Sequence, residues 1–413
     1  MSDATARRSH ISIVIFTIFL DMLGIGILLP VIPQLLANPE SPHYLLPAGW
    51  SLEQGYLLLG LLTAAYPIAQ FFAAPILGQL SDKAGRRPVL AFSLAGTALS
   101  YVLFALAILW RDIPLLFFSR ILDGITGGNI SVAQAAIADV SDSTNRAKNF
   151  GLMGAAFGLG FIIGPFIGGK LADPSVLPWF NAATPFWFAA ILSVLNMLFV
   201  IFWFGETNLH RTTGKLTWSK SLKNIADAFR LKELRMLFLT NFLYVSGFTF
   251  FTTFFGVYLI AQFSFSEGNI GDLFAYIGLW IVFTQAVVTR LVAKRYGERS
   301  VLNVAMPITG ILMLFLLIPW SWAWLLLTVP VFAIFNGLTQ ANFMAFLSHK
   351  ADPRMQGEIL GINASVAALG QALPPVLSGL IAARFAAVTP LFVAAAVIIV
   401  AGAVFVAAHR PSR

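Results

Sequence analysis

The chain has 413 residues, 58% of them hydrophobic and 11% charged, with a mean hydropathy of +0.82. A water-soluble protein cannot bury so much apolar surface, so the composition predicts an all-α protein with many membrane-spanning helices. The absence of cysteine excludes disulfides, thiolate metal sites and cysteine nucleophiles. The net charge of +8 does not indicate nucleic acid, because the cations follow a membrane topology.

Hydrophobic runs bounded by charged residues, Pro and Gly predict twelve transmembrane helices, since about 20 apolar residues cross a bilayer. The expected spans are 11–36, 52–79, 88–110, 114–139, 146–171, 182–204, 236–262, 270–293, 300–319, 323–348, 356–383 and 388–408. The first run follows two arginines, like a signal peptide. However, it carries Asp21 and ends in PVIP rather than in a cleavage site, so we expect a retained helix.

The cations predict the orientation of the chain in the membrane. With both termini in the cytoplasm, all but four of the 26 Lys and Arg residues lie on the cytoplasmic side. Arg111, Lys170 and Arg384 fall outside, and Arg120 lies within a span. The positive-inside rule therefore favours cytoplasmic termini, and we expect a multi-pass protein of a bacterial inner membrane.

A polar stretch divides the chain into two sets of six spans. We expect an N-terminal six-helix bundle at 1–204, a cytoplasmic linker at 205–235 and a C-terminal six-helix bundle at 236–413. Within the linker, 218–234 has helical apolar spacing with basic residues around it. This pattern fits an amphipathic helix on the cytoplasmic face, and it fits a flexible basic linker equally well.

The two halves read as copies of one another. The segment 290–302 aligns with 78–90, so that Gly297 falls on Gly85 and Lys294 replaces Asp82. Further matches join Gly151–Gly169 with Gly361–Gly379, and Asp123–Thr126 with Asn336–Thr339. Duplicated six-helix halves with a site between them are typical of a secondary transporter that works by alternating access.

The turn GQLSDKAGRRPVL at 78–90 concentrates charge between two apolar runs. Its notable residues are Gly78, Asp82, Lys83, Gly85, Arg86 and Arg87. The glycine at position 85 suits the backbone angles of a tight turn. Such a turn can serve only to set topology, but the weaker echo of the same pattern at 290–302 favours a further role.

Three ionisable residues fall deep in predicted spans, where they are energetically expensive and therefore candidates for function. Asp21 is near the middle of span one, and Arg120 and Asp123 share one face of span four at spacing i, i+3. By depth, all three can meet near the midplane. We interpret them as a proton-coupling group in which Arg120 pairs with Asp21; static salt bridges that fix helix packing are the alternative.

Other spans carry weaker signals. Span five is rich in glycine around Pro165, which suits close helix approach and a bend; its expected motif residues are Gly160, Gly164, Pro165, Gly168 and Gly169. Span seven carries an aromatic stripe that fits a cavity, the protein core or a lipid-facing surface. Candidate residues for a substrate cavity are Gln134, Asn241, Tyr244, Phe248, Phe251, Asn336, Gln340 and Asn363.

Several of these motifs together resemble the drug:proton antiporter branch of the major facilitator superfamily, especially tetracycline-exporter-like proteins. They are DMLGIGILLPVIP at 21–33, the 78–90 turn, RILDGITGG at 120–128 with IAD at 137–139, and the Gly-Pro-Gly block of span five. The resemblance implies that Asp21 is the essential acid of span one. It also implies that Asp82 and Arg86 belong to a gating loop, with Asp82 near the start of span five, and that Arg120 takes part in proton transfer.

The same resemblance implies a monomer that uses the proton gradient, without a cofactor, to export a small amphipathic compound. Tetracycline exporters carry further acids in spans three and nine; here span three has Ser100 and span nine has no acid, which weakens tetracycline itself as substrate. A proton-coupled importer or metabolite carrier is the alternative. A sensor, or an enzyme, is a third class, and no nucleophile–base pair or phosphate loop in the sequence supports an enzyme.

Overall fold

The computed structural model describes residues 3–141, 146–208, 211, 216–217, 219–231, 234–318, 321–350 and 356–409. All regular elements in these residues are helices. In chain order they are α1 (Asp3–Leu36), α2 (Leu52–Ala84), α3 (Arg86–Trp110), α4 (Ile113–Thr126), α5 (Asn129–Asp139), α6 (Arg146–Ala172), α7 (Thr184–Trp203), α8 (Lys220–Arg230), α9 (Arg235–Phe263), α10 (Glu267–Phe283), η1 (Thr284–Val288), α11 (Thr289–Ala293), α12 (Glu298–Leu316), α13 (Trp322–Lys350), α14 (Gln356–Arg384) and α15 (Thr389–Ala408).

Polar residues in the loops start several of these helices. Ser51 caps α2 in a capping box with Gln54, and Ser266 caps α10 in the same way with Asn269. The side chain of Asp112 accepts a hydrogen bond from the backbone N–H of Leu115 at the start of α4. Each cap satisfies backbone donors that the first turn of a helix leaves unpaired.

The fourth expected span is interrupted. Eleven helices in the described residues are long and apolar enough to cross a membrane, whereas α4 and α5 divide the predicted helix 114–139 at Gly127 and Gly128. Consecutive glycines weaken a helix, and here they also allow close packing on α2. A Cβ on Gly128 would lie 2.8 Å from the Cα of Ala74. The expectation of one continuous helix at 114–139 is therefore wrong.

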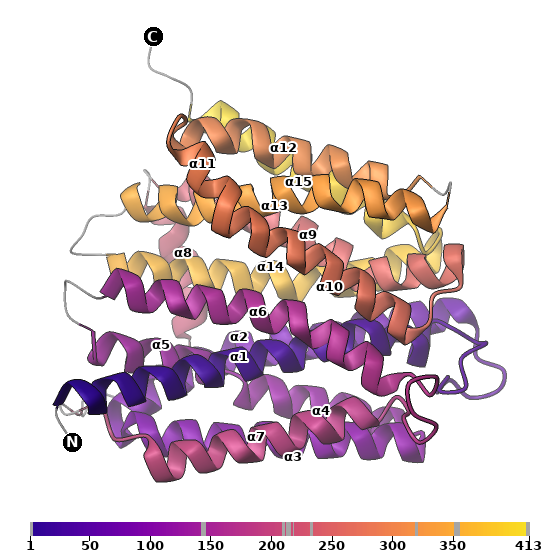
Figure 1. Ribbon diagram of the computed structural model, residues 1–413, viewed down its shortest axis with the longest axis horizontal. Helices are drawn as coiled ribbons and strands as arrows, with labels where there is room; N and C mark the ends of the chain where they lie inside the picture. Colours follow the sequence, from indigo (N-terminus) through magenta and orange to yellow (C-terminus); the bar gives the residue numbers. More distant parts are fainter. Residues whose placement is uncertain are drawn as a thin grey trace.

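The helices form two bundles that lie side by side, α1 to α7 below and α9 to α15 above in Figure 1. Both described ends of the chain lie at the same end of the molecule, on the left of Figure 1, which we call the terminal end. We call the opposite end the far end. The bundles contact each other along two seams, one between α2 and α14 and one between α6 and α10.

Several close contacts between the two halves lie toward the far end of these seams. A Cβ on Gly379 of α14 would lie 3.2 Å from the Cα of Gly60 on α2, and Lys170 of α6 pairs with Asp272 of α10 at 2.8 Å. Toward the terminal end, a Cβ on Gly154, Gly158 or Gly361 would meet nothing within 4 Å. The close backbone approaches between glycines of the two halves therefore lie toward the far end, and these three glycines take no part in them.

Candidate functional site

The carboxylate of Asp21 is buried in α1, with a residue exposure of 7%. Its neighbours include Asn129, the first residue of α5, and the negative charge of Asp123 on α4. One carboxylate oxygen, Oδ2, is buried and has no hydrogen-bond partner among the described residues. Burying an ionised oxygen without a hydrogen-bond donor costs free energy, and protonation of the carboxylate removes this cost.

Arg120 and Asp123 form an ion pair within α4. The Nη1 of Arg120 lies 2.7 Å from Oδ2 of Asp123, and both residues are buried. The guanidinium carbon also lies 4.8 Å from the ring centroid of Tyr66 on α2, close enough for a cation–π contact. The Nε of Arg120 has no partner in the described part of the chain. The sequence predicted that Asp21 pairs with Arg120; instead, Arg120 is held by Asp123, three residues away on its own helix.

Two tyrosines border this group of charges. Tyr66 accepts a hydrogen bond from Nε2 of Gln70 at 2.8 Å, and Tyr101 on α3 is buried next to Asp123. The hydroxyl of Tyr101 lies against Gly24 on α1, where a larger residue would collide with it. The glycine therefore lets a polar group of α3 reach the helix that carries Asp21.

The turn between α2 and α3 is organised around the buried Arg86. Its Nη1 donates to Asp82 at 2.6 Å and its Nε donates to Asp139 at 2.9 Å, at the end of α5. Gly85 has φ +107°, a conformation that side chains with a Cβ rarely adopt. Asp82 thus reaches α5 through Arg86, whereas residues 142–145 and the side chains of 142–148, at the expected start of span five, lie outside the described part.

A short segment after α7 binds the same turn. The carboxylate of Glu206 accepts hydrogen bonds from the backbone N–H groups of Arg86 (2.8 Å) and Arg87 (3.3 Å), at the start of α3. The side chain of Asn208 donates to the carbonyl of Asp82 at 2.9 Å, at the end of α2. A carboxylate at a helix N-terminus is electrostatically favourable, so this segment stabilises both helix ends. In addition, the Arg87 guanidinium donates to the carbonyl of Ile201.

The glycines of α6 form its contact surface with α1. A Cβ on Gly160, Gly164 or Gly168 would lie 2.5–2.6 Å from the carbonyl oxygens of α1. Gly169 instead faces α10, where its Cβ would lie 3.1 Å from the Cα of Gly271, and Pro165 packs against Gly26 of α1. The block therefore brings α6 close both to the helix of Asp21 and to the other half of the molecule.

The second half holds a neutral polar cluster. Nδ2 of Asn241 on α9 donates to Oδ1 of Asn363 on α14 at 2.8 Å, and the hydroxyl of Tyr244 donates to Oδ1 of Asn336 on α13. Gln340 lies beside Tyr244 and is half-buried. Gln134, on α5 in the first half, is also half-buried and is not part of this cluster.

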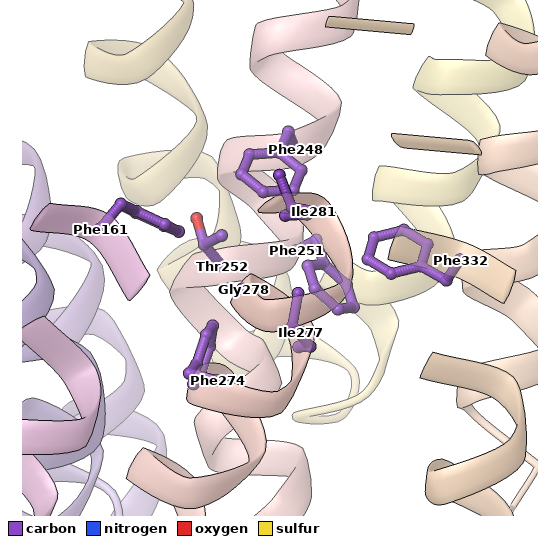
Figure 2. Close-up of a pocket in the computed structure, with 9 residues that line it drawn as sticks. All are labelled: Phe161, Phe248, Phe251, Thr252, Phe274, Ile277, Gly278, Ile281 and Phe332. Atoms are coloured by element: carbon purple, nitrogen blue, oxygen red, sulfur yellow. The ribbon is translucent and has the colours of Figure 1, made fainter. Parts of the chain in front are cut away.

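A small apolar pocket is lined mainly by residues of the second half (Figure 2). Phe248 and Phe251 of the expected aromatic stripe line it together with Thr252, whereas Phe255 is fully buried behind them and stacks on Phe251 with centroids 4.4 Å apart. The remaining lining residues come from three helices: Phe161 of α6, Phe274, Ile277, Gly278 and Ile281 of α10, and Phe332 of α13. Phe161 belongs to the first half, so both bundles contribute to the pocket.

Sequence reasoning missed Tyr66, Tyr101, Asp139 and Glu206 as parts of these sites. A tyrosine in a hydrophobic span gives little signal, because it suits a core and an interface equally. Glu206 follows the end of a span and reads as an ordinary loop carboxylate. Asp139 was visible in the IAD motif, although without an assigned partner.

Comparison with known proteins agrees with this architecture. The family model described as Major Facilitator Superfamily matches residues 14–375 and 237–413. The class H tetracycline resistance protein of Pasteurella multocida is 33% identical over 375 residues, covering 90% of this chain and 88% of that protein. The class B protein of Escherichia coli is 30% identical and covers 91% of this chain and 88% of that protein.

Solved structures show the same fold. The crystal structure of the human organic anion transporter MFSD10 has a TM-score of 0.71 at 24% identity, over 97% of this chain and 99% of that chain. A D-xylose–proton symporter has a TM-score of 0.74 at 13% identity, over 96% of each chain. With two bundles, the repeat and these matches in agreement, the chain belongs to the major facilitator superfamily and is a multi-pass membrane transporter.

Proposed function

We propose that the protein is a proton-coupled antiporter that exports a small amphipathic organic compound across a bacterial inner membrane. The observation that carries this proposal is the buried carboxylate of Asp21, whose Oδ2 has no partner among the described residues and which lies close to the Arg120–Asp123 ion pair. A membrane carboxylate in such a place is suited to binding and releasing a proton.

The mechanism follows from the charges of this group. When Asp21 is ionised, it and the Asp123–Arg120 pair carry one net negative charge in a buried site. A proton on Asp21 removes that charge and turns Oδ2 into a donor. Asp21 can then lose its proton only when water reaches it from one side, so its charge state is tied to which end of the transporter is open.

The orientation of the chain gives this cycle a direction. With both termini in the cytoplasm, as the cations predict, the terminal end is cytoplasmic. The Asp82–Arg86–Asp139 network would then lie at the cytoplasmic gate, where an outward-facing state brings the halves together.

The aromatic side chains and the neutral amides of the second half are residue types that suit a substrate with an apolar body and a few polar groups. In the described structure the space between the aromatic side chains is about 10 Å³, enough for one water molecule, so a substrate would need these side chains to move apart. Tetracycline resistance proteins are among the relatives, which favours drug export, and an organic anion transporter shares the fold. Neither the proton gradient nor the substrate requires a cofactor in this scheme, and we expect a monomer to be sufficient.

The test uses purified protein in liposomes that contain a pH-sensitive dye. Under an imposed proton gradient, addition of the transported compound should cause a proton flux across the membrane of liposomes that carry the native protein. The same flux is expected with the control Glu40→Gln, which loses only an exposed carboxylate in a loop. Asp21→Asn should abolish this flux while the protein still inserts and elutes as a single species. Full proton-linked flux in Asp21→Asn contradicts the mechanism, and flux of substrate and protons in the same direction identifies an importer instead.

A further inference from the structure

The short helix α8 between the two bundles has three distinct faces. At about 100° per residue, Ser221, Asn224 and Ala228 share one face of the helix. Leu222, Ala226 and Phe229 share the next face, and the third carries the charged residues Lys220, Lys223, Asp227 and Arg230. An interfacial helix needs an apolar and a charged face, and a third face leaves room for contact with protein.

The first face attaches α8 to both halves of the transporter. The hydroxyl of Ser221 donates to the backbone carbonyl of Phe71 on α2 at 2.5 Å. On the other side, Nδ2 of Asn224 donates to Oγ of Ser365 on α14 at 2.9 Å. α8 therefore crosses the α2–α14 seam, and Figure 1 shows it running across the direction of the long helices.

The two attachment points lie at the same depth. Phe71 and Ser365 are each roughly 20 residues, or about 30 Å, from the far end of their helix. Both points therefore lie on the terminal side of the middle of their helices. This depth differs from that of the α2–α3 turn, which is a further 13 residues along α2.

The other two faces are exposed at this depth. Leu222 is 56% exposed and Phe229 is 67% exposed, although both are large apolar side chains. Lys220, Lys223 and Arg230 are also exposed. Asp227 pairs with Arg230 at 3.5 Å, so the charged face remains positive overall.

We propose that α8 binds the membrane surface itself, with Leu222 and Phe229 in the acyl-chain boundary and its cations on anionic lipid headgroups. A bilayer with anionic lipids matches both the exposed apolar side chains and the positive sign of the charge. Because α8 is hydrogen-bonded to both halves, lipid binding to α8 would anchor a strap across the α2–α14 seam.

The native chain has no cysteine, so single cysteines can be spin-labelled without background. The full-length protein would carry Phe229→Cys on the apolar face or Lys223→Cys on the charged face, reconstituted in phosphatidylcholine vesicles with or without phosphatidylglycerol. Collision rates with oxygen and with a nickel chelate report the depth of each label. We expect the label at 229 to favour oxygen and the label at 223 to favour the nickel chelate.

Charge recognition is tested by adding Lys220→Gln and Arg230→Gln to the Phe229→Cys protein. Each cation near an anionic surface contributes about 1 kcal/mol to membrane binding. In vesicles with phosphatidylglycerol, the ratio of labels buried in the bilayer to labels exposed to water should therefore fall about fivefold for each cation removed. The matched control, Lys294→Gln with Arg295→Gln at the exposed end of α11, should leave the ratio unchanged.

Three results would overturn the proposal. A label at 229 that favours the nickel chelate in both vesicles places α8 in water. A depth that does not respond to phosphatidylglycerol excludes headgroup recognition, and an equal effect of the α11 pair shows a general surface charge rather than a site on α8.

Discussion

The two halves use the same repeat for different chemistry. In the first half, Arg120 and Asp123 form a buried ion pair beside Asp21. At the aligned positions of the second half stand Ala333 and Asn336, and Asn336 accepts from Tyr244. At these aligned positions, one half carries charge and the other carries a neutral hydrogen bond.

The turns at the terminal end differ in the same way. The first has Gly85 at φ +107° and a buried Arg86 held by two acids, whereas its copy has Gly297 at φ −72° and Lys294 in place of Asp82. A Cβ on Gly297 would meet nothing within 4 Å, while one on Gly85 would collide with Glu206. Gly85 is therefore constrained twice, by its positive φ and by the linker segment that binds there, and neither constraint recurs at Gly297.

The ion pair should give the largest change in stability. Removing one member of a buried pair leaves an uncompensated charge, so Arg120→Gln and Asp123→Asn should each lower the free energy of unfolding by about 3–5 kcal/mol. The double variant should recover most of this loss. A double-mutant cycle on unfolding midpoints in detergent measures the coupling, and simple additivity of the two losses would show that the residues do not act as a pair.

The contact of α6 with α1 should give an intermediate change. Gly164→Ala places a Cβ 2.5 Å from the carbonyl oxygen of Leu23, and such overpacking costs about 1–3 kcal/mol. Gly158→Ala on the same helix is the matched control, because its Cβ meets nothing within 4 Å. Gly158→Ala should leave stability unchanged or raise it slightly, because alanine favours a helix more than glycine does. The same unfolding measurement applies, and an equal loss of stability in both variants would show that the contact with Leu23 is not the cause.

The neutral cluster should give the smallest change. Tyr244→Phe removes one donor to Asn336 and should cost about 1 kcal/mol, the usual net contribution of a hydrogen bond. We also expect this variant to keep substrate-independent proton permeability at the native level, because Tyr244 lies outside the charged group. A loss as large as that of Arg120→Gln would remove the distinction between the two halves.

Sequence alone determined the fold class, the duplicated halves and most of the spans. The length of an apolar run decides whether it can cross a bilayer, the positions of Lys and Arg decide its orientation, and both are local properties of the sequence. It also identified Asp21, Arg120 and Asp123, since ionisable residues stand out in apolar runs. The sequence also showed the aromatic stripe of span seven, but it did not show which of these side chains line the pocket and which are buried in the core.

Only the tertiary structure decided which of these groups meet. Arg120 pairs with Asp123 rather than with Asp21 because a neighbour on the same helix face is already within reach, whereas Asp21 comes from another helix. The break after Thr126 depends on how closely α5 approaches Ala74, and the role of Glu206 depends on a contact across 120 positions of the chain. Such contacts are set by the packing of helices far apart in sequence, which hydrophobic pattern and charge do not encode.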